Sequence, residues 1–174
     1  ASLAESVTRF RGPLIRDIVA AGHEVSVGAP GIDGSLRSEI EALGVRAFET
    51  PLLRNKISLW GDLDYHKRLY RLMKRLKPNL VLTYTIKPNI WGAIAARRAG
   101  IPSSALITGL GFAFAGLGCG ENFKARFSGI IARKLYGIAA GFHRTLIFQN
   151  PDDRAVFIAA GCLKDETKCE IVNG

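Results

Sequence analysis

Lys87 has the residue type and position best suited to chemistry in this chain. It follows a run of apolar residues that predicts a buried strand, and with Asn89 it forms a polar turn before a predicted helix. Free backbone N–H groups at a helix N-terminus, with an ammonium beside them, hold a phosphate well. The alternative is a solvated turn lysine. A second turn follows the next predicted strand, which favours binding, and it contains Thr108, Gly109 and Gly111.

Parallel strands end at one edge of a sheet, so both turns are expected at one ligand-binding edge. Arg9 and Arg11 precede the first predicted helix at the same edge, and Gly12 begins that helix. The arginines either bind phosphate or are merely solvated. Asn150 ends another predicted strand and faces the same edge, although N-capping of the next helix also explains it. His23 directly follows Gly22 and is interpreted as structural, and neither His66 nor His143 has a partner spaced for metal binding or nucleophilic catalysis. Catalytic residues therefore stay unknown, and neither a metal nor a cofactor is predicted.

The glycine-rich stretch that follows fails two nucleotide-binding fingerprints. Its third glycine, Gly116, comes five residues after the second, and no acidic residue follows at the spacing of a dinucleotide site. Leu117 stands where a P-loop requires lysine. Phe112, Phe114 and Leu117 are carried on these flexible glycines, and we expect them to contact a membrane.

Composition indicates a folded globular domain. The 174 residues are 48% hydrophobic and 22% charged, and 24 Lys and Arg against 15 Asp and Glu give a net charge of +9. That charge attracts phosphates, nucleic acid or anionic lipid and does not choose among them. Three cysteines without CxxC spacing indicate neither a disulfide framework nor zinc, so a reducing compartment is expected. Neither a signal peptide nor a membrane-spanning helix is predicted.

Hydrophobic spacing predicts alternating helices and strands. Helices are expected over residues 12–22, 35–43, 60–77, 89–99, 123–140 and 151–161, and strands over residues 24–29, 45–48, 80–83, 104–108, 145–148 and 170–172. This alternation predicts an α/β fold with an open, mostly parallel Rossmann-like sheet and helices on both faces, in a single domain over residues 1–174. Residues 1–10 would make a poor central strand. One interpretation is that the first strand of the sheet lies upstream of this sequence. The helices over 60–77 and 123–140 are basic enough to sit on an anionic bilayer, although core packing with a solvated face is the commoner explanation.

Six short pieces follow one another over nearly the whole chain. They are Phe10-Arg-Gly-Pro-Leu-Ile, Gly22-His-Glu-Val, Thr85-Ile-Lys-Pro-Asn, Ile107-Thr-Gly-Leu-Gly, Leu135-Tyr136 and Phe148-Gln-Asn-Pro-Asp-Asp. Together they resemble the N-terminal domain of family 4 glycosyltransferases, which have two Rossmann-like domains (the GT-B fold). The nearest branch is the bacterial one that adds sugars to undecaprenyl-diphosphate-linked acceptors for surface polysaccharides or glycans.

This resemblance implies an acceptor-binding domain that is not active alone. In the family, a C-terminal domain, absent from this sequence, carries the nucleotide-sugar site. The implied partners are a lipid-linked sugar acceptor, a nucleotide-sugar donor bound through that second domain, and an anionic membrane surface, but not nucleic acid. The implied location is cytoplasmic and peripheral on the inner face of the bacterial plasma membrane. One departure is that residues 109–111 stand where many relatives carry a histidine.

Two other interpretations stay open. A non-catalytic module could dock on a membrane or a partner through its basic face. Alternatively, the chain could be half of a sugar-nucleotide epimerase with the same two-domain architecture.

Overall fold

The computed structural model describes residues 1–53, 59–111, 114, 123–163 and 165–172. The chain divides into two compact units, Ala1–Tyr65 and His66–Gly174, and each is described by itself. Every strand pair in the described residues is parallel, so the predicted α/β class with parallel strands is confirmed. The assignment of residues 1–174 to one domain stays a prediction.

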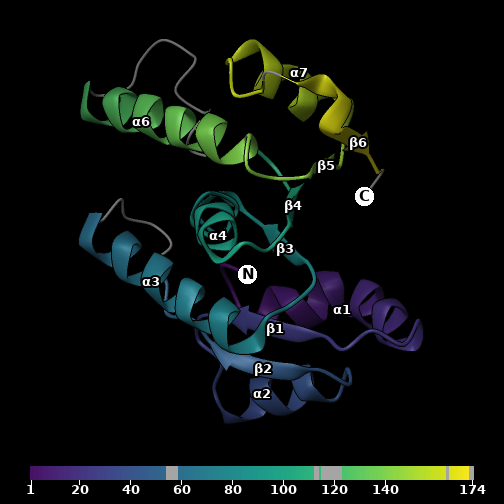
Figure 1. The fold of residues 1–174 in the computed structure, drawn as a ribbon. Helices are drawn as coiled ribbons and strands as arrows, with labels where there is room; N and C mark the ends of the chain where they lie inside the picture. Colours follow the sequence, from purple (N-terminus) through teal and green to yellow (C-terminus); the bar gives the residue numbers. More distant parts are fainter. Residues whose placement is uncertain (54–58, 112–113, 115–122, 164, 173–174) are drawn as a thin grey trace. The chain divides into compact units, whose positions relative to one another are not determined.

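The first unit holds a two-stranded parallel sheet and its helices (Figure 1). Its elements are α1 (Glu5–Ala20), β1 (Ser26–Ala29), α2 (Gly34–Glu41), β2 (Arg46–Glu49) and the start of α3 (Leu59–Leu76). Val7, Ile15 and Ile40 are buried with Ala29 and Ala47 of the two strands, and they form the unit's core. Burying these apolar side chains is the main force that holds α1 and α2 on the sheet.

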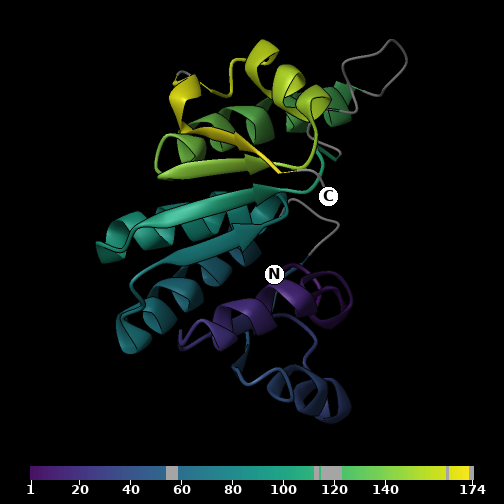
Figure 2. The ribbon, with the colours of Figure 1, turned by 90° about the vertical axis from the view of Figure 1, so that its right-hand side faces the viewer.

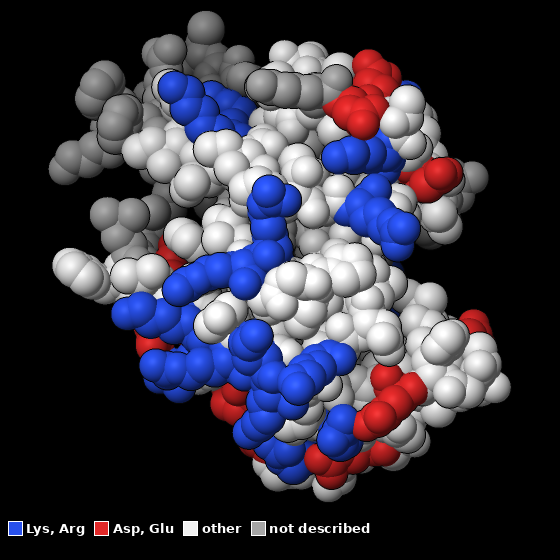
Figure 3. All heavy atoms as spheres, in the orientation of Figure 1, with Lys and Arg blue, Asp and Glu red and all other residues white. Residues whose placement is uncertain are grey.

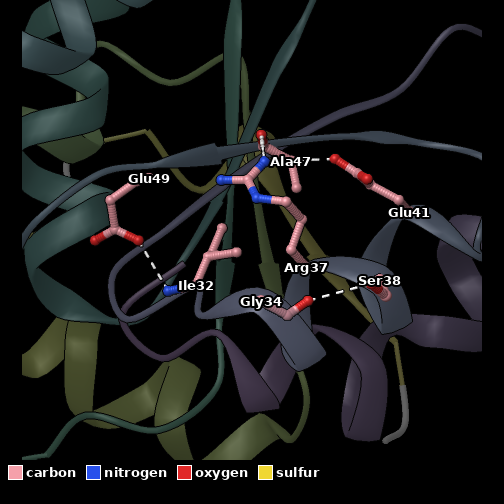
Figure 4. Close-up of polar contacts among 7 residues, drawn as sticks. All are labelled: Ile32, Gly34, Arg37, Ser38, Glu41, Ala47 and Glu49. Carbon is pink, nitrogen blue, oxygen red and sulfur yellow. Dashed lines mark hydrogen bonds and ion pairs between the residues drawn. The ribbon is translucent and has the colours of Figure 1, made fainter.

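Polar contacts fix the loops of this unit (Figure 4). The Glu49 carboxylate accepts hydrogen bonds from the backbone N–H groups of Gly31, at 3.0 Å, and Ile32, at 2.8 Å. Arg37 donates to the carbonyl oxygen of Ala47 at 2.8 Å and also pairs with Glu41. Two backbone donors of the loop after β1 are therefore already used by a carboxylate of this chain.

Helix α1 begins seven residues earlier than the sequence pattern predicted, at Glu5 rather than residue 12. Pro13, a residue type that favours the first turn of a helix, lies inside α1. Val7 and Ile15 are buried on the same side of the helix, and this burial outweighs the hydrogen bond that proline removes. As a result Arg9 and Arg11 lie within α1 and not in a loop before it.

The second unit is built on a four-stranded parallel sheet of order β3-β4-β5-β6. Its elements, after the remainder of α3, are β3 (Val81–Tyr84), α4 (Ile86–Ala99), β4 (Ser103–Ile107), α6 (Phe123–Ala140), β5 (Thr145–Phe148), α7 (Pro151–Ala159), the 3-10 turn η1 (Glu166–Lys168) and β6 (Cys169–Ile171). Because right-handed crossovers join neighbouring strands in order, α4, α6 and α7 are expected on one face of the sheet. The packing of α6 against α7 agrees with this expectation, since the rings of Tyr136 and Phe157 meet edge to face with their centres 5.0 Å apart.

An aromatic cluster forms the centre of the second unit's core. Tyr136, Phe148 and Phe157 are fully buried, and the ring centres of Phe148 and Phe157 lie 5.6 Å apart. Phe114 joins them, with its ring 5.8 Å from that of Phe157, and it is only 6% exposed. The structure therefore differs from the expectation that Phe114 contacts a membrane, because its ring finds apolar partners in the core.

Phe112 and Leu117, the other two residues of that expectation, lie outside the described residues. Among the helices that the structure describes, none combines the length and the apolar character needed to cross a bilayer.

Candidate functional site

Three strands of the second unit end at one edge of its sheet. Tyr84 of β3 pairs with Leu106 of β4, and Ile107 of β4 pairs with Phe148 of β5. In Figure 2 the arrows of these strands lie side by side and point the same way. The segments that follow them, which begin at residues 85, 108 and 149, therefore emerge at the carboxyl edge, where open parallel sheets bind ligands.

The N-terminus of α4 lies at this edge. The helix begins at Ile86, three residues before the predicted start, so Lys87 lies in its first turn and not in a loop. Pro88 also lies in this first turn, which suits proline because its missing N–H would have no partner within the helix. Thr85 precedes the helix and its side chain makes no capping hydrogen bond.

The backbone of Thr85 is strained. Its φ of +69° and ψ of 156° fall in a region that is nearly restricted to glycine and is rare for a β-branched residue. Such strain, of about 1–3 kcal/mol, is found most often where a ligand binds or a segment switches. Sequence reasoning did not identify Thr85, because threonine gives no local signal for this conformation.

Lys87 is buried, with only 8% of its surface exposed. This burial is inconsistent with the alternative of a solvated turn lysine. The uncapped start of α4 contributes a partial positive charge beside it. An ammonium and a helix N-terminus at the same sheet edge form an electropositive position suited to an anionic group.

The glycine turn after β4 packs against this helix start. Gly109 has a φ of +125° and Gly111 a φ of +52°, conformations that residues with a side chain rarely adopt. A Cβ atom on Gly111 would lie 3.0 Å from Cδ1 of Ile86, so the two predicted turns are in contact. A Cβ atom on Gly109 would meet no atom of the described residues within 4 Å, and Thr108 is half-buried next to it.

Asn89 is fully buried and has a structural role. Its Nδ2 donates to the carbonyl oxygen of Leu106, at 3.2 Å, and to the hydroxyl of Tyr136, at 2.7 Å. The amide therefore ties the first turn of α4 to β4 and α6. Its Oδ1 is buried without a hydrogen-bond partner in the described part of the chain, which is unusual for a native structure.

His143 completes this buried network. Its Nε2–H donates to the backbone oxygen of Asn89 at 3.0 Å, and its Nδ1 lies 3.0 Å from the Ser103 hydroxyl, which donates to it. Burial lowers the pKa of His143, while interactions with the backbone of Asn89 and of Ser103 act in the opposite direction. Sequence reasoning found no partner for His143, because its two partners lie 54 and 40 residues away in the chain.

Asn150 caps α7. Its Oδ1 accepts from the backbone N–H of Asp153 at 2.7 Å, and its Nδ2 donates to the carboxylate of the same residue at 3.0 Å. Asp152 adds a second negative charge to the first turn. The simpler of the two interpretations of Asn150 thus accounts for its contacts, and the positive end of α7 is already matched by acidic side chains.

The structure brings together Lys87, Asn89, Thr108, Gly109, Gly111 and Asn150 at one edge of the second unit. Arg9, Arg11 and Gly12 belong to the first unit, so their part in the same site stays a prediction. Among the described residues there is no group of three or more His, Cys, Asp or Glu side chains that could hold a metal ion.

The sequence of the chain matches a known family. The model of the glycosyl transferase 4-like domain aligns with residues 7–161. The chain belongs to this family. The resemblance drawn from the six sequence pieces is thereby confirmed, and the family match favours sugar transfer over the epimerase and docking-module interpretations.

Two enzymes of known activity are similar in sequence. An Escherichia coli UDP-Gal:alpha-D-GlcNAc-diphosphoundecaprenol alpha-1,3-galactosyltransferase is 36% identical over 114 residues, which are 66% of this chain and 28% of that enzyme. A Campylobacter jejuni N,N'-diacetylbacillosaminyl-diphospho-undecaprenol alpha-1,3-N-acetylgalactosaminyltransferase is 27% identical over 167 residues, 95% of this chain and 43% of that enzyme. The chain thus spans less than half the length of either relative.

Solved structures share the fold. Anabaena Alr3699/HepE, crystallised in complex with UDP, superimposes with a TM-score of 0.58 at 17% identity over 92% of this chain and 39% of that one. At this identity the likeness shows the fold alone, and it supports the predicted fold class.

Proposed function

We propose that residues 1–174 are the acceptor-binding part of a glycosyltransferase that moves a sugar from a nucleotide-sugar donor to a lipid-diphosphate-linked acceptor. One observation carries the proposal. The names of both relatives give a diphosphoundecaprenol-linked sugar as the acceptor, whereas the transferred sugars differ, galactose in one and N-acetylgalactosamine in the other. A segment similar to both enzymes is expected to recognise what their substrates share, the lipid diphosphate.

The edge of the second unit suits a diphosphate chemically. Lys87 and the start of α4 would offset its negative charge, and burial strengthens this attraction because little water screens it. Thr108 and Gly109 would border the acceptor sugar, where the backbone can approach it closely. Asn89 and His143 would act indirectly, because their hydrogen bonds hold the first turn of α4 in place.

Other parts of the proposal concern the whole protein. Arg9, Arg11 and Gly12 would contribute further contacts to the acceptor phosphates. The nucleotide sugar would be bound by a second, C-terminal domain, so residues 1–174 alone would not catalyse transfer. The protein would work at the inner face of the plasma membrane, bound peripherally to its anionic surface.

Substitution of Lys87 in the complete protein tests the proposal. Because the side chain is buried, Lys87→Met removes the charge and keeps most of the volume, and Lys168→Met, on η1, is the matched control. Losing one charge-assisted hydrogen bond of about 1.5–3 kcal/mol should raise the acceptor KM about 10- to 150-fold. The donor KM should not change. A folded Lys87→Met protein with an unaltered acceptor KM would refute the assignment.

A further inference from the structure

The positive charge of the chain is concentrated in one stretch. Between Asp64 and Asp152, Glu121 is the only acidic residue, against fourteen Lys and Arg. This stretch includes the second unit's part of α3 together with α4 and α6. These helices form one layer. The ring centres of His66 on α3 and Trp91 on α4 lie 6.1 Å apart, and α4 packs against α6. We call these three helices, from residue 66 onward, the helix layer.

Helix α3 presents cations on its exposed side. Leu69 and Met73 are buried, while Lys67, Arg71 and Lys74 are exposed at spacings of four and three residues and form one stripe. Figure 3 shows Lys and Arg side chains gathered over α3 and α4.

Two arginines of α4 extend this cationic surface. The guanidinium of Arg98 lies 4.8 Å from the centre of the Tyr70 ring and 3.3 Å from Nε2 of His66. That of Arg97 lies 4.8 Å from the centre of the Phe142 ring, just after α6. Cation–π contacts of this kind hold the guanidinium groups in place while both residues stay exposed.

Helix α6 adds exposed apolar side chains. Ile130 is 44% exposed, Ile131 38% and Ile138 57%, and the exposed Lys134 lies between them in the sequence. Single exposed apolar residues are ordinary, but three isoleucines on one helix are a feature of surfaces that bind something. Apolar side chains next to cations match the boundary between lipid headgroups and acyl chains.

Simpler explanations cover only part of this pattern. Lys74, Arg97 and Arg98 lie in last helical turns, where cations stabilise the helix dipole. That effect explains neither Arg71, further from the helix end, nor the isoleucines. A nucleic acid would pair with the cations but would leave the isoleucines in water.

We propose that the exposed surface of the helix layer docks on an anionic lipid bilayer. The proposal rests on the proposed function to the extent that a lipid-linked acceptor places the enzyme at a membrane. Cations of α3 and α4 neutralise lipid phosphates, and the isoleucines of α6 enter the headgroup boundary. The bilayer supplies the anionic phosphates that the cations require and the apolar boundary that the isoleucines require, so this complementarity identifies the bilayer as the occupant.

Vesicle co-sedimentation of the complete protein tests this surface. Removing two cations in Arg71→Gln/Lys74→Gln should weaken binding to phosphatidylglycerol vesicles about 30-fold, at about five-fold for each cation near the surface. Arg16→Gln/Arg46→Gln removes the same charge from the first unit and should leave binding within about two-fold. Equal weakening by both pairs would show that only net charge matters, and would overturn the proposal.

The apolar contribution has its own variants. Ile138→Asn should weaken vesicle binding about five- to ten-fold, since roughly half of its side chain becomes buried in the bilayer. Val156→Asn on α7, an exposed apolar residue outside the helix layer, should change it little. An Ile138→Asn protein with unchanged vesicle binding, together with tight RNA homopolymer binding that is lost in Arg71→Gln/Lys74→Gln, would assign the surface to nucleic acid instead.

Turnover separates this proposal from the proposed function. With a short-chain, water-soluble diphosphate acceptor, Arg71→Gln/Lys74→Gln should retain its kcat/KM, and with the acceptor embedded in anionic vesicles it should lose activity. Lys87→Met should fail with both acceptors. Normal turnover of vesicle-embedded acceptor by Arg71→Gln/Lys74→Gln overturns the docking surface alone, whereas normal turnover by Lys87→Met overturns the acceptor site alone.

Discussion

Gly92→Ala tests how closely α4 must approach the sheet. A Cβ atom at this position would lie 2.7 Å from Cγ2 of Thr83 on β3, closer than real Cβ contacts. Thr83 is buried, and its hydroxyl lies 3.4 Å from the carbonyl oxygen of Ser104, to which it donates. Rotating the threonine away from the new methyl would disturb this hydrogen bond, so α4 or β3 must move.

Two opposing effects set the size of the change. Alanine favours the helix over glycine by about 1 kcal/mol, and overpacking a close-packed core costs about 1–3 kcal/mol. We therefore expect Gly92→Ala to destabilise the protein by up to about 2 kcal/mol. It should also raise the acceptor KM, because the helix start at Thr85 moves with α4.

Thr83→Ser provides the decisive background. It deletes the clashing methyl and keeps the hydroxyl, so Gly92→Ala should there stabilise the protein by about 1 kcal/mol through helix propensity alone. The sign of the effect reverses, and a double-mutant cycle should give a coupling of about 1–3 kcal/mol. Urea unfolding monitored by circular dichroism measures all four proteins.

Gly34→Ala on α2 is the control, since a Cβ atom there meets no atom within 4 Å in the part of the chain that the structure describes. It should be neutral or mildly stabilising. If Gly92→Ala destabilised the wild-type protein and the Thr83→Ser variant equally, the steric argument would be refuted. So would stabilisation of the wild-type protein by Gly92→Ala.

Other measurements examine the buried network, the cap and the glycine turn. Burial lowers the pKa of His143 and of His66, so the unfolded chain binds protons more readily than the folded one; stability should therefore fall as the pH drops below about 6.5, with a shallower fall in His143→Gln. Asn150→Ala should cost about 1 kcal/mol in urea unfolding because the cap of α7 is lost, whereas Asn150→Ser keeps a capping oxygen and should cost much less. Gly109→Ala should cost about 1–3 kcal/mol, since φ is +125° there, and should raise the acceptor KM, an effect not expected from Gly161→Ala, whose φ of +68° lies in another turn.

Element types could be predicted from the sequence, but two helix starts could not. The strand over residues 145–148 agrees with β5 at both ends, and the pattern over residues 60–77 agrees with α3 to within one residue at each end. Both wrong starts involve proline. Pro13 lies inside α1, where burial of the flanking residues outweighs the lost hydrogen bond, and Pro88 lies in the first turn of α4, which proline fits readily.

For the candidate site, too, one part could be predicted from the sequence and another could not. Its position after β3 and β4 followed from strand order, because parallel strands end at one edge whatever their side chains are. The roles of individual residues did not follow. Asn89 was expected to bind ligand and instead holds α4 against β4 and α6, and Phe114 was expected at a membrane and lies in the core.

By itself the sequence determined the alternation of helices and strands, the parallel class, the glycine turn at residues 109–111 and the family. These properties depend on residue types at short spacing, which set backbone conformation and apolar periodicity locally. The tertiary structure alone decided that Lys87 is buried and that His143 supports Asn89. Such facts depend on contacts between residues tens of positions apart, and only the packing of α4 and α6 on the sheet brings those residues within hydrogen-bonding distance.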